Sequence, residues 1–223
     1  MGWVFKFINS SIGKKFMMAL TGSFLLIFLI VHLIGNLSLF LGEDAFNAYV
    51  LALDAIKPLI RVIEVVLLTA FVIHILNGTR LWITNKRSKG PKNKINGSPE
   101  NSDVFSRTMF LTGSIIFIFL VLHLGTFFWR FNVYDPLQMA DDHQYYAMVV
   151  YFFNMWWYAI LYVIAMILLG YHLNHGFQSA FQTFGWNHKK YTPWIKKIGT
   201  AYAIIMALGF ASMPIYFLLG GGN

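Results

Sequence analysis

The chain has 223 residues, of which 57% are hydrophobic and only 12% are charged, and it contains no cysteine. This composition excludes an ordinary soluble domain, and the lack of cysteine excludes disulfides, thiolate metal sites and haem attached through C-x-x-C-H. The net charge of +8 comes mainly from basic residues in links between hydrophobic stretches, so we relate it to anionic lipid and expect no nucleic acid partner.

A helix needs about 20 apolar residues to cross a bilayer. Five windows meet this requirement, so we predict an all-α membrane protein with one transmembrane domain over residues 1–223. We expect residues 1–11 to lie at the membrane interface, with Ser10 or Ser11 capping the first span. The polar stretch 84–107, rich in Gly, Pro and Asn, is predicted to be a loop. The predicted spans are 16–41, 59–83, 108–129, 147–173 and 198–219.

The basic residues are distributed unevenly between the two sides of this arrangement. All of the 17 Lys and Arg residues except Lys57, Arg61 and Arg130 fall on the N-terminal arm or near the second and fourth links. Short loops rich in Lys and Arg remain on the cytoplasmic side of a membrane. We therefore predict a cytoplasmic N-terminus and an outer C-terminus.

Two stretches of the chain repeat each other. LTGSFLLIFLIVHL at 20–33 and LTGSIIFIFLVLHL at 111–124 each place LTGS nine residues before a histidine. Each copy is followed by a hydrophobic segment with a histidine four residues before a glycine, which gives His74 with Gly78 and His172 with Gly176. The pattern indicates a duplicated two-helix unit with one histidine in each of the first four spans.

Depth and helix direction sort these histidines into an outer pair, His32 with His123, and an inner pair, His74 with His172. Polar side chains inside a bilayer are costly and usually functional, although one such histidine can simply bond a neighbouring carbonyl. Imidazole pairs without thiolates, and with few carboxylates nearby, favour two bis-histidine haem b groups. His175, three residues from His172, remains an alternative ligand.

Small residues in the repeat are predicted to lie at membrane depths close to those of the histidine pairs. Thr21 and Thr112 precede their histidines by three helical turns, about 16 Å, which brings them to the depth of the inner pair. Their hydroxyls could bond a haem propionate, and the adjacent Gly22 and Gly113 would let a flat macrocycle approach the backbone. Gly78 and Gly176 would give similar clearance. Ordinary close packing of membrane helices is the alternative for all of these glycines.

Several segments together resemble the membrane cytochrome b subunit of succinate:quinone and quinol:fumarate oxidoreductases, in its five-helix dihaem form found in bacteria. The resemblance covers nearly the whole chain. It is carried by SSIGKKFMMALTG, by VHLIGN and GEDAFN around and after His32, by IEVVLLTAFVIH ending at His74, by IFIFLVLH ending at His123, and by YHLNHGFQSAFQTFGW around His172.

This resemblance implies a multi-pass subunit of the bacterial cytoplasmic membrane. An iron–sulfur subunit and an FAD-bearing flavoprotein subunit would dock on the cytoplasmic face, and two haems would connect them to a quinone. By matching position, His74 and His172 would hold the haem nearer the iron–sulfur subunit. Menaquinone is expected, because the dihaem type usually pairs with it. Some fumarate-reducing relatives carry a glutamate where Gly170 stands here, so the same proton route is in doubt.

No compact motif marks a quinone site. Glu64 is the one carboxylate well inside a predicted span, about 15 Å before His74 and so near the outer pair. It could exchange protons with a quinol, or simply form a salt bridge with Arg61, one turn away. Tyr162, placed equivalently before His172, could line the same cavity.

Two other classes of protein stay open at this point. One is the cytochrome b subunit of a hydrogenase or formate dehydrogenase, and the other is a haem-free duplicated transporter. The physiological direction of succinate chemistry and dimerisation of the complex are also left open. The chain alone has neither flavin nor dicarboxylate site, so we expect it to be inactive towards succinate.

Overall fold

A computed structural model describes residues 2–88, 104–134 and 144–222. The predicted loop at 84–107 falls mostly on residues 89–103, outside the described residues. Helices make up almost the whole of the described chain. They are α1 Gly2–Asn9, α2 Ser11–Asn36, the 3₁₀ helix η1 Leu37–Leu41, α3 Glu43–Ala55, α4 Lys57–Ser88, α6 Val104–His123, the π-helix η2 Leu124–Phe128, α7 Trp129–Asn132, α8 Tyr145–Phe153, α9 Trp156–Thr183 and α10 Thr192–Leu218.

The predicted all-α architecture with five membrane-spanning helices is confirmed. Five helical stretches of the described chain are long and apolar enough to cross a membrane: Ser11–Leu41, Lys57–Ser88, Phe105–Asn132, Trp156–Thr183 and Thr192–Leu218. The predicted cap of the first span is Ser10, whose hydroxyl accepts from the backbone N–H of Gly13 at 3.0 Å.

The fourth span differs from its predicted range of 147–173. The chain breaks at Asn154 and at the extended residue Met155, so residues 147–153 belong to the separate helix α8. Helix α9 then continues ten residues beyond the predicted end, to Thr183. Hydropathy is nearly continuous across the break, so only Asn154, a residue type that favours helix ends over helix interiors, marks it in the sequence.

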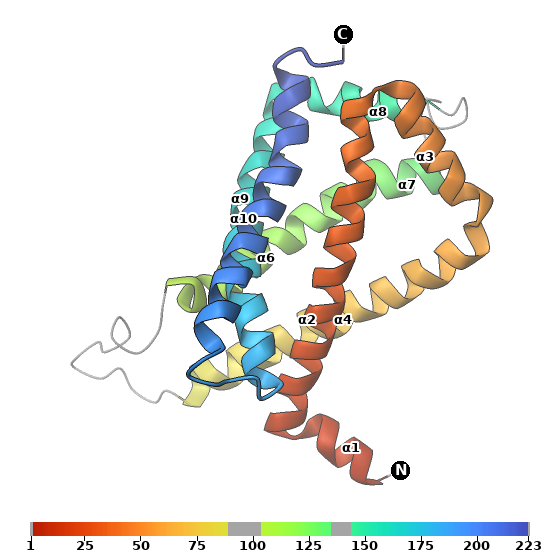
Figure 1. The fold of residues 1–223 in the computed structure, drawn as a ribbon. Helices are drawn as coiled ribbons and strands as arrows, with labels where there is room; N and C mark the ends of the chain where they lie inside the picture. Colours follow the sequence, from red (N-terminus) through yellow and green to blue (C-terminus); the bar gives the residue numbers. More distant parts are fainter. Residues whose placement is uncertain (1, 89–103, 135–143, 223) are drawn as a thin grey trace.

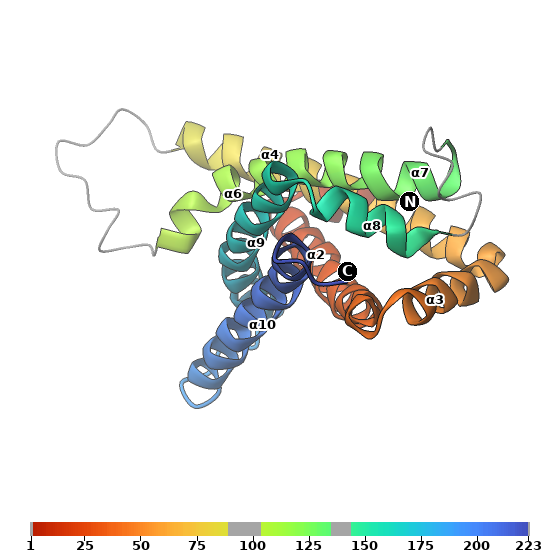
Figure 2. The ribbon, with the colours of Figure 1, turned by 90° about the horizontal axis from the view of Figure 1, so that it is seen from above.

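Helix α9 lies at the centre of the packing, with α10 along one side and α2 and α6 on others. Helices α4 and α6 run obliquely across the other long helices (Figures 1 and 2). Helix α2 packs on α4, and α6 packs on α9, so each copy of the repeat is a pair of neighbouring helices. Many apolar side chains of α4, including Val62, Val65 and Leu68, are exposed and suit contact with lipid.

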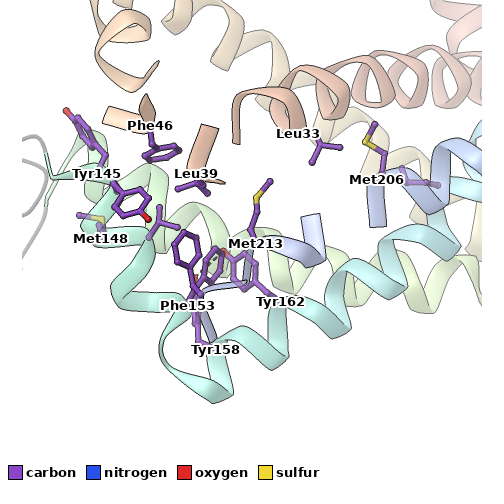
Figure 3. Close-up of a cluster of buried hydrophobic side chains, with 14 of the residues drawn as sticks. Leu33, Leu39, Phe46, Tyr145, Met148, Phe153, Tyr158, Tyr162, Met206 and Met213 are labelled. Carbon is purple, nitrogen blue, oxygen red and sulfur yellow. Dashed lines mark hydrogen bonds between the residues drawn. The ribbon is translucent and has the colours of Figure 1, made fainter. Parts of the chain in front are cut away.

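The two ends of the molecule differ in composition. Helix α1, the end of α4 and the link between α9 and α10 lie at one end, and these are the basic segments (Figure 1). The C-terminus, α3 and α8 lie at the other end, where an aromatic cluster around Phe153 and Tyr162 is buried (Figure 3). There Asn47 accepts from the backbone N–H of Tyr146 at 2.9 Å, which ties α3 to α8. We call the first the basic end and the second the aromatic end.

Candidate functional site

The four repeat histidines come together as two pairs, each formed across the two copies of the repeat. The ring centroids of His74 on α4 and His172 on α9 lie 6.4 Å apart, with 63° between the ring planes. Those of His32 on α2 and His123 at the end of α6 lie 5.8 Å apart, with 86° between the planes. The first pair is nearer the basic end and the second is nearer the aromatic end, and we refer to them as the inner and outer pairs.

Both rings of the inner pair are held by the repeated threonines. Thr21 Oγ1 lies 3.3 Å from His74 Nδ1, and Thr112 Oγ1 lies 3.4 Å from His172 Nδ1. Each contact joins the two helices of one repeat unit. The hydroxyls predicted to bond a propionate are therefore bonded to the histidines themselves.

The direction of these bonds follows from the number of hydroxyl protons. Thr21 donates its single proton to a backbone carbonyl, that of Met17 at 2.8 Å, and Thr112 donates to that of Met109 at 3.1 Å. Each threonine must then accept from its histidine, so the imidazole proton is on Nδ1. This tautomer leaves Nε2 with a free lone pair, which is the form of histidine that binds metals.

The repeated glycines allow the helices to approach these rings closely. A Cβ atom at Gly22 would lie 3.3 Å from His74 Cε1, and one at Gly113 would lie 3.2 Å from His172 Cε1. One turn beyond each histidine, a Cβ atom at Gly78 or Gly176 would meet the methyl group of a methionine in the preceding helix of the same unit. The small residues thus set the distance between the two helices of each unit at the inner level.

The outer pair sits among aromatic rings. His32 stacks on Phe28 with centroids 5.2 Å apart, and His123 stacks on Phe119 at 5.8 Å. Both phenylalanines lie one helical turn before their histidines. Phe210, from α10, lies 5.7 Å from His32, so the fifth span contributes a contact although it carries no repeat histidine. The repeated F-x-x-x-H spacing is the sequence signal that marks these stacking partners.

The hydrogen bonds of the outer pair are not symmetric. His123 Nδ1 lies 3.0 Å from the hydroxyl of Tyr162 on α9, which in turn accepts from Tyr158 at 3.1 Å. His32 Nδ1 lies 3.4 Å from the side-chain amide of Asn36, one turn later on its own helix. Asn36 and Tyr158 were not singled out by sequence, because nothing in the repeat marks them.

The backbone also differs after the two outer histidines. The chain tightens into the 3₁₀ helix Leu37–Leu41 shortly after His32, whereas it widens into the π-helix Leu124–Phe128 directly after His123. Short π-helical segments occur often at functional sites. The two copies of the repeat therefore diverge at the outer histidines.

The tautomer that leaves the Nε2 lone pair free follows for the inner pair, whereas Nδ1 of His32 accepts from the side-chain amide of Asn36. Within the described part of the chain, the side-chain hydrogen bonds of these histidines involve only Nδ1, and no fully buried polar side-chain atom lacks a partner. Among the same residues there is no group of three or more His, Cys, Asp or Glu side chains that could hold a metal ion. The donor sets are pairs of imidazoles.

The predicted quinone residues Glu64, Arg61 and Tyr162 have different hydrogen-bond partners. Arg61 donates to Glu64 at 2.6 Å and to Asn132 of α7 at 2.8 Å, so the alternative interpretation of Glu64 as half of a salt bridge describes the geometry. Tyr162 lies against His123 and Phe153 instead. The sequence left His175 as an alternative to His172 as a ligand. In the structure, the ring of His172 faces His74.

The comparison with protein families agrees with this arrangement. Residues 16–99 match the family described as succinate dehydrogenase/fumarate reductase transmembrane subunit. The matched segment contains Thr21, His32 and His74, and the internal repeat carries the same pattern into the second half of the chain. No curated protein and no solved structure gives a significant match. Over residues 16–99 the chain is thus similar to the family of succinate dehydrogenase/fumarate reductase transmembrane subunits.

Proposed function

We propose that this membrane subunit passes electrons between an iron–sulfur subunit and a quinone through two haem b groups. The outer pair, His32 and His123, would hold one haem, and the inner pair, His74 and His172, would hold the other. The observation that carries the proposal is the presence of two facing imidazole pairs, each bonded at Nδ1, in a chain whose residues 16–99 match this family.

The pair distances support ligation of one metal ion by each pair. Metal–imidazole bonds are about 2 Å long, and a ring nitrogen lies about 1.1 Å from its ring centre, so two axial imidazoles have centroids about 6 Å apart. The observed separations are 5.8 and 6.4 Å. Two donors per site also suit haem, whose macrocycle supplies the other ligands, better than zinc, which takes three or four protein ligands.

The surrounding residues have distinct roles in this proposal. When bound, each haem iron would take up and release one electron at a time. Thr21 and Thr112 would fix the tautomer and the orientation of the inner ligands, since a bond at the second ring nitrogen orients a metal-binding histidine. Gly22 and Gly113 would keep the helices close enough for that bond. Phe28 and Phe119 would hold the outer rings by stacking.

The distribution of basic residues indicates the side of the membrane on which the partner subunits would dock. The basic end carries Lys14, Lys15, Lys189 and Lys190, and basic segments remain on the cytoplasmic side. We infer that the iron–sulfur subunit and the FAD-bearing flavoprotein bind at this end, in the cytoplasmic membrane of a bacterium. The quinone, which we infer to be menaquinone from the dihaem resemblance, would react near the outer pair.

The decisive experiment is a reduced-minus-oxidised absorption spectrum of the purified chain, combined with extraction of its haem. We expect b-type bands and two non-covalent haems per chain. Absence of b-type bands and of extractable haem would refute the proposal and favour a haem-free membrane protein. Copurification with an iron–sulfur and a flavin subunit would distinguish this assembly from a hydrogenase or formate dehydrogenase.

A further inference from the structure

A shallow pocket of about 430 Å³ lies near the start of α10, at the basic end of the molecule. It is lined by Lys196, Lys197, Thr200, Ala201 and Ile204, all of which are exposed. These residues form one stripe along the helix, because side chains three and four positions apart share a face. The stripe begins with two lysines and ends with apolar side chains. We call it the basic pocket.

The lysines of this pocket have no acidic neighbours. The last Asp or Glu in the sequence is Asp142, so α8, α9, α10 and the links between them contain no carboxylate side chain. Within the described part of the chain, neither Lys196 nor Lys197 forms an ion pair. Their positive charge is thus not balanced by the protein, and it attracts an anion.

The pocket extends from the level of the lipid headgroups into the apolar span. Trp194, which is 63% exposed, lies two residues before the lysines, and exposed tryptophan is typical of the membrane interface. From Lys196 to Ile204 the helix rises by about 12 Å. Ile204 and, one turn later, Leu208 are 52% and 66% exposed, so the apolar end continues along the surface of the span. The pocket therefore suits a ligand that combines an anionic group with an apolar chain.

The lysines supply the hydrogen-bond donors of the pocket. Thr200 uses its single proton on Asn174 Oδ1 of α9, at 3.0 Å, and Gln178 donates to the same oxygen at 2.8 Å. These two bonds fix which side of α10 meets α9. The ammonium group of Lys197 lies 5.3 Å from the centre of the Trp194 ring, a contact that holds it near the interface without occupying a hydrogen-bond acceptor. Its N–H donors stay available for a ligand.

The position of α10 favours a lipid over a soluble partner. The helix lies at an edge of the molecule, beside α9 and away from α4 and α6 (Figure 2). A soluble subunit at the basic end could reach the lysines, but it could not cover Ile204 and Leu208, which lie within the span. An acyl chain can, because it occupies the hydrocarbon region beside an exposed helix. Basic pockets on the cytoplasmic side of membrane helices bind anionic headgroups.

We propose that the basic pocket binds an anionic glycerophospholipid, with its phosphate at Lys196 and Lys197 and an acyl chain along Ala201 and Ile204. The cytoplasmic leaflet carries anionic lipid, and the basic end would face that leaflet. The inference goes beyond the proposed function and is independent of haem, since no repeat histidine takes part. It gives a ligand to the fifth span.

The test is native mass spectrometry of the purified full chain in a neutral detergent, titrated with phosphatidylglycerol. We expect one lipid to bind more tightly than all later ones. Lys196→Gln/Lys197→Gln should weaken its binding about thirtyfold, because two basic residues near the membrane surface are lost. The matched control, Lys14→Gln/Lys15→Gln, removes the same charge from α2 at the same end and should leave the binding nearly unchanged. Equal weakening in both variants would overturn the site.

Further arms test the two parts of the lipid separately. Ile204→Trp should fill the apolar end of the pocket and weaken binding about tenfold. Ile205→Trp should leave it unchanged, because Ile205 is 59% exposed but lies outside the pocket. Phosphatidylcholine, which has no net charge, should bind at least tenfold more weakly, and glycerol phosphate, which has no acyl chain, should not compete. Wild-type binding in Ile204→Trp, equal binding of phosphatidylcholine, or competition by glycerol phosphate would overturn the proposal.

Copurification of partner subunits distinguishes the lipid from a docked protein. If Lys196→Gln/Lys197→Gln released a soluble subunit while phosphatidylglycerol bound as in the wild type, the lysines would belong to that interface and the lipid assignment would be wrong. The helical circular dichroism signal shows whether each variant has folded. The difference spectrum should be the same in all of them, so the lipid site and the proposed haem sites are tested independently.

Discussion

The inner and outer histidine pairs derive from the same duplicated unit, but their surroundings differ. Around the inner pair every contact occurs twice: threonine to Nδ1, glycine against Cε1, and methionine against the next glycine. Around the outer pair only the stacked phenylalanines repeat. His32 is bonded by Asn36 of its own helix, whereas His123 is bonded by Tyr162 of another.

This difference indicates separate demands on the two levels. A site that only holds a cofactor between helices can keep the symmetry of the duplication. A site whose histidines also bond residues of other helices need not keep it, because those helices lie on one side only. The π-helix after His123 and the Tyr158–Tyr162 chain both occur on that side. The predictions that follow test whether the two levels are independent, from the largest expected effect to the smallest.

Removing one ligand should empty one level and leave the other intact. His74→Ala takes the inner ligand from α4, and His32→Ala takes the outer ligand from α2. Each variant should keep about half of the extractable haem, because each pair holds its own iron through two imidazoles. Potentiometric titration should show one component in each, and a different one in the two variants. Loss of both haems in either variant would show that the levels are coupled.

Removing the bond at Nδ1 should weaken haem binding at the inner level. Thr21→Val keeps the shape of the side chain but leaves His74 without its acceptor. Loss of such a partner typically lowers metal affinity about 10–100-fold. Transfer of haem to an acceptor protein should therefore accelerate for one of the two haems. Thr69→Val is the matched control, since Thr69 bonds only the carbonyl of Val65. An equal rate in both variants would contradict the proposed role of Thr21.

Adding a methyl group next to a histidine ring of the inner pair should displace that ring slightly. In Gly113→Ala the new Cβ would lie 3.2 Å from His172 Cε1, so the ring must yield by a few tenths of an ångström. The electron paramagnetic resonance signal of the inner low-spin haem should shift while that of the outer haem stays in place. Gly125→Ala is the control, because its Cβ would meet nothing within 4 Å. Shifts of both signals in Gly113→Ala would contradict independent levels.

The smallest effect is expected at the salt bridge of α4. Glu64→Gln removes a pair spaced three residues apart, which contributes about 0.5 kcal/mol or less to the free energy of unfolding. Asp54→Asn removes a pair of the same spacing and length, with Lys57 at 2.6 Å, and should cost about as much. Thermal unfolding measures both. A much larger cost at Glu64, or an altered haem spectrum, would indicate a role for this carboxylate at the outer level.

Several features of the molecule followed from the sequence alone. Hydropathy located the five long helices, because a span must be apolar over its whole length whatever it packs against. The repeat placed one histidine in each of four helices, since the rise per residue is constant along a helix. The same regularity brought Thr21 and Thr112 to the inner level, although it could not show that their hydroxyls lie within hydrogen-bond distance of His74 and His172.

Other features were decided only by the tertiary structure. Tyr162 lies 39 residues beyond His123 and bonds it because α6 packs on α9, a contact that no local pattern encodes. A hollow of about 370 Å³ at the aromatic end is lined by residues of α6, η2, α7, α8 and α9, and α8 and α9 meet there because the chain turns at Asn154 within an almost continuous hydrophobic stretch. Periodicity specifies positions along a helix, whereas the rotation and crossing of helices depend on side-chain packing. For this reason the ligand candidates were predictable from the sequence, and the residues that surround the outer pair were not.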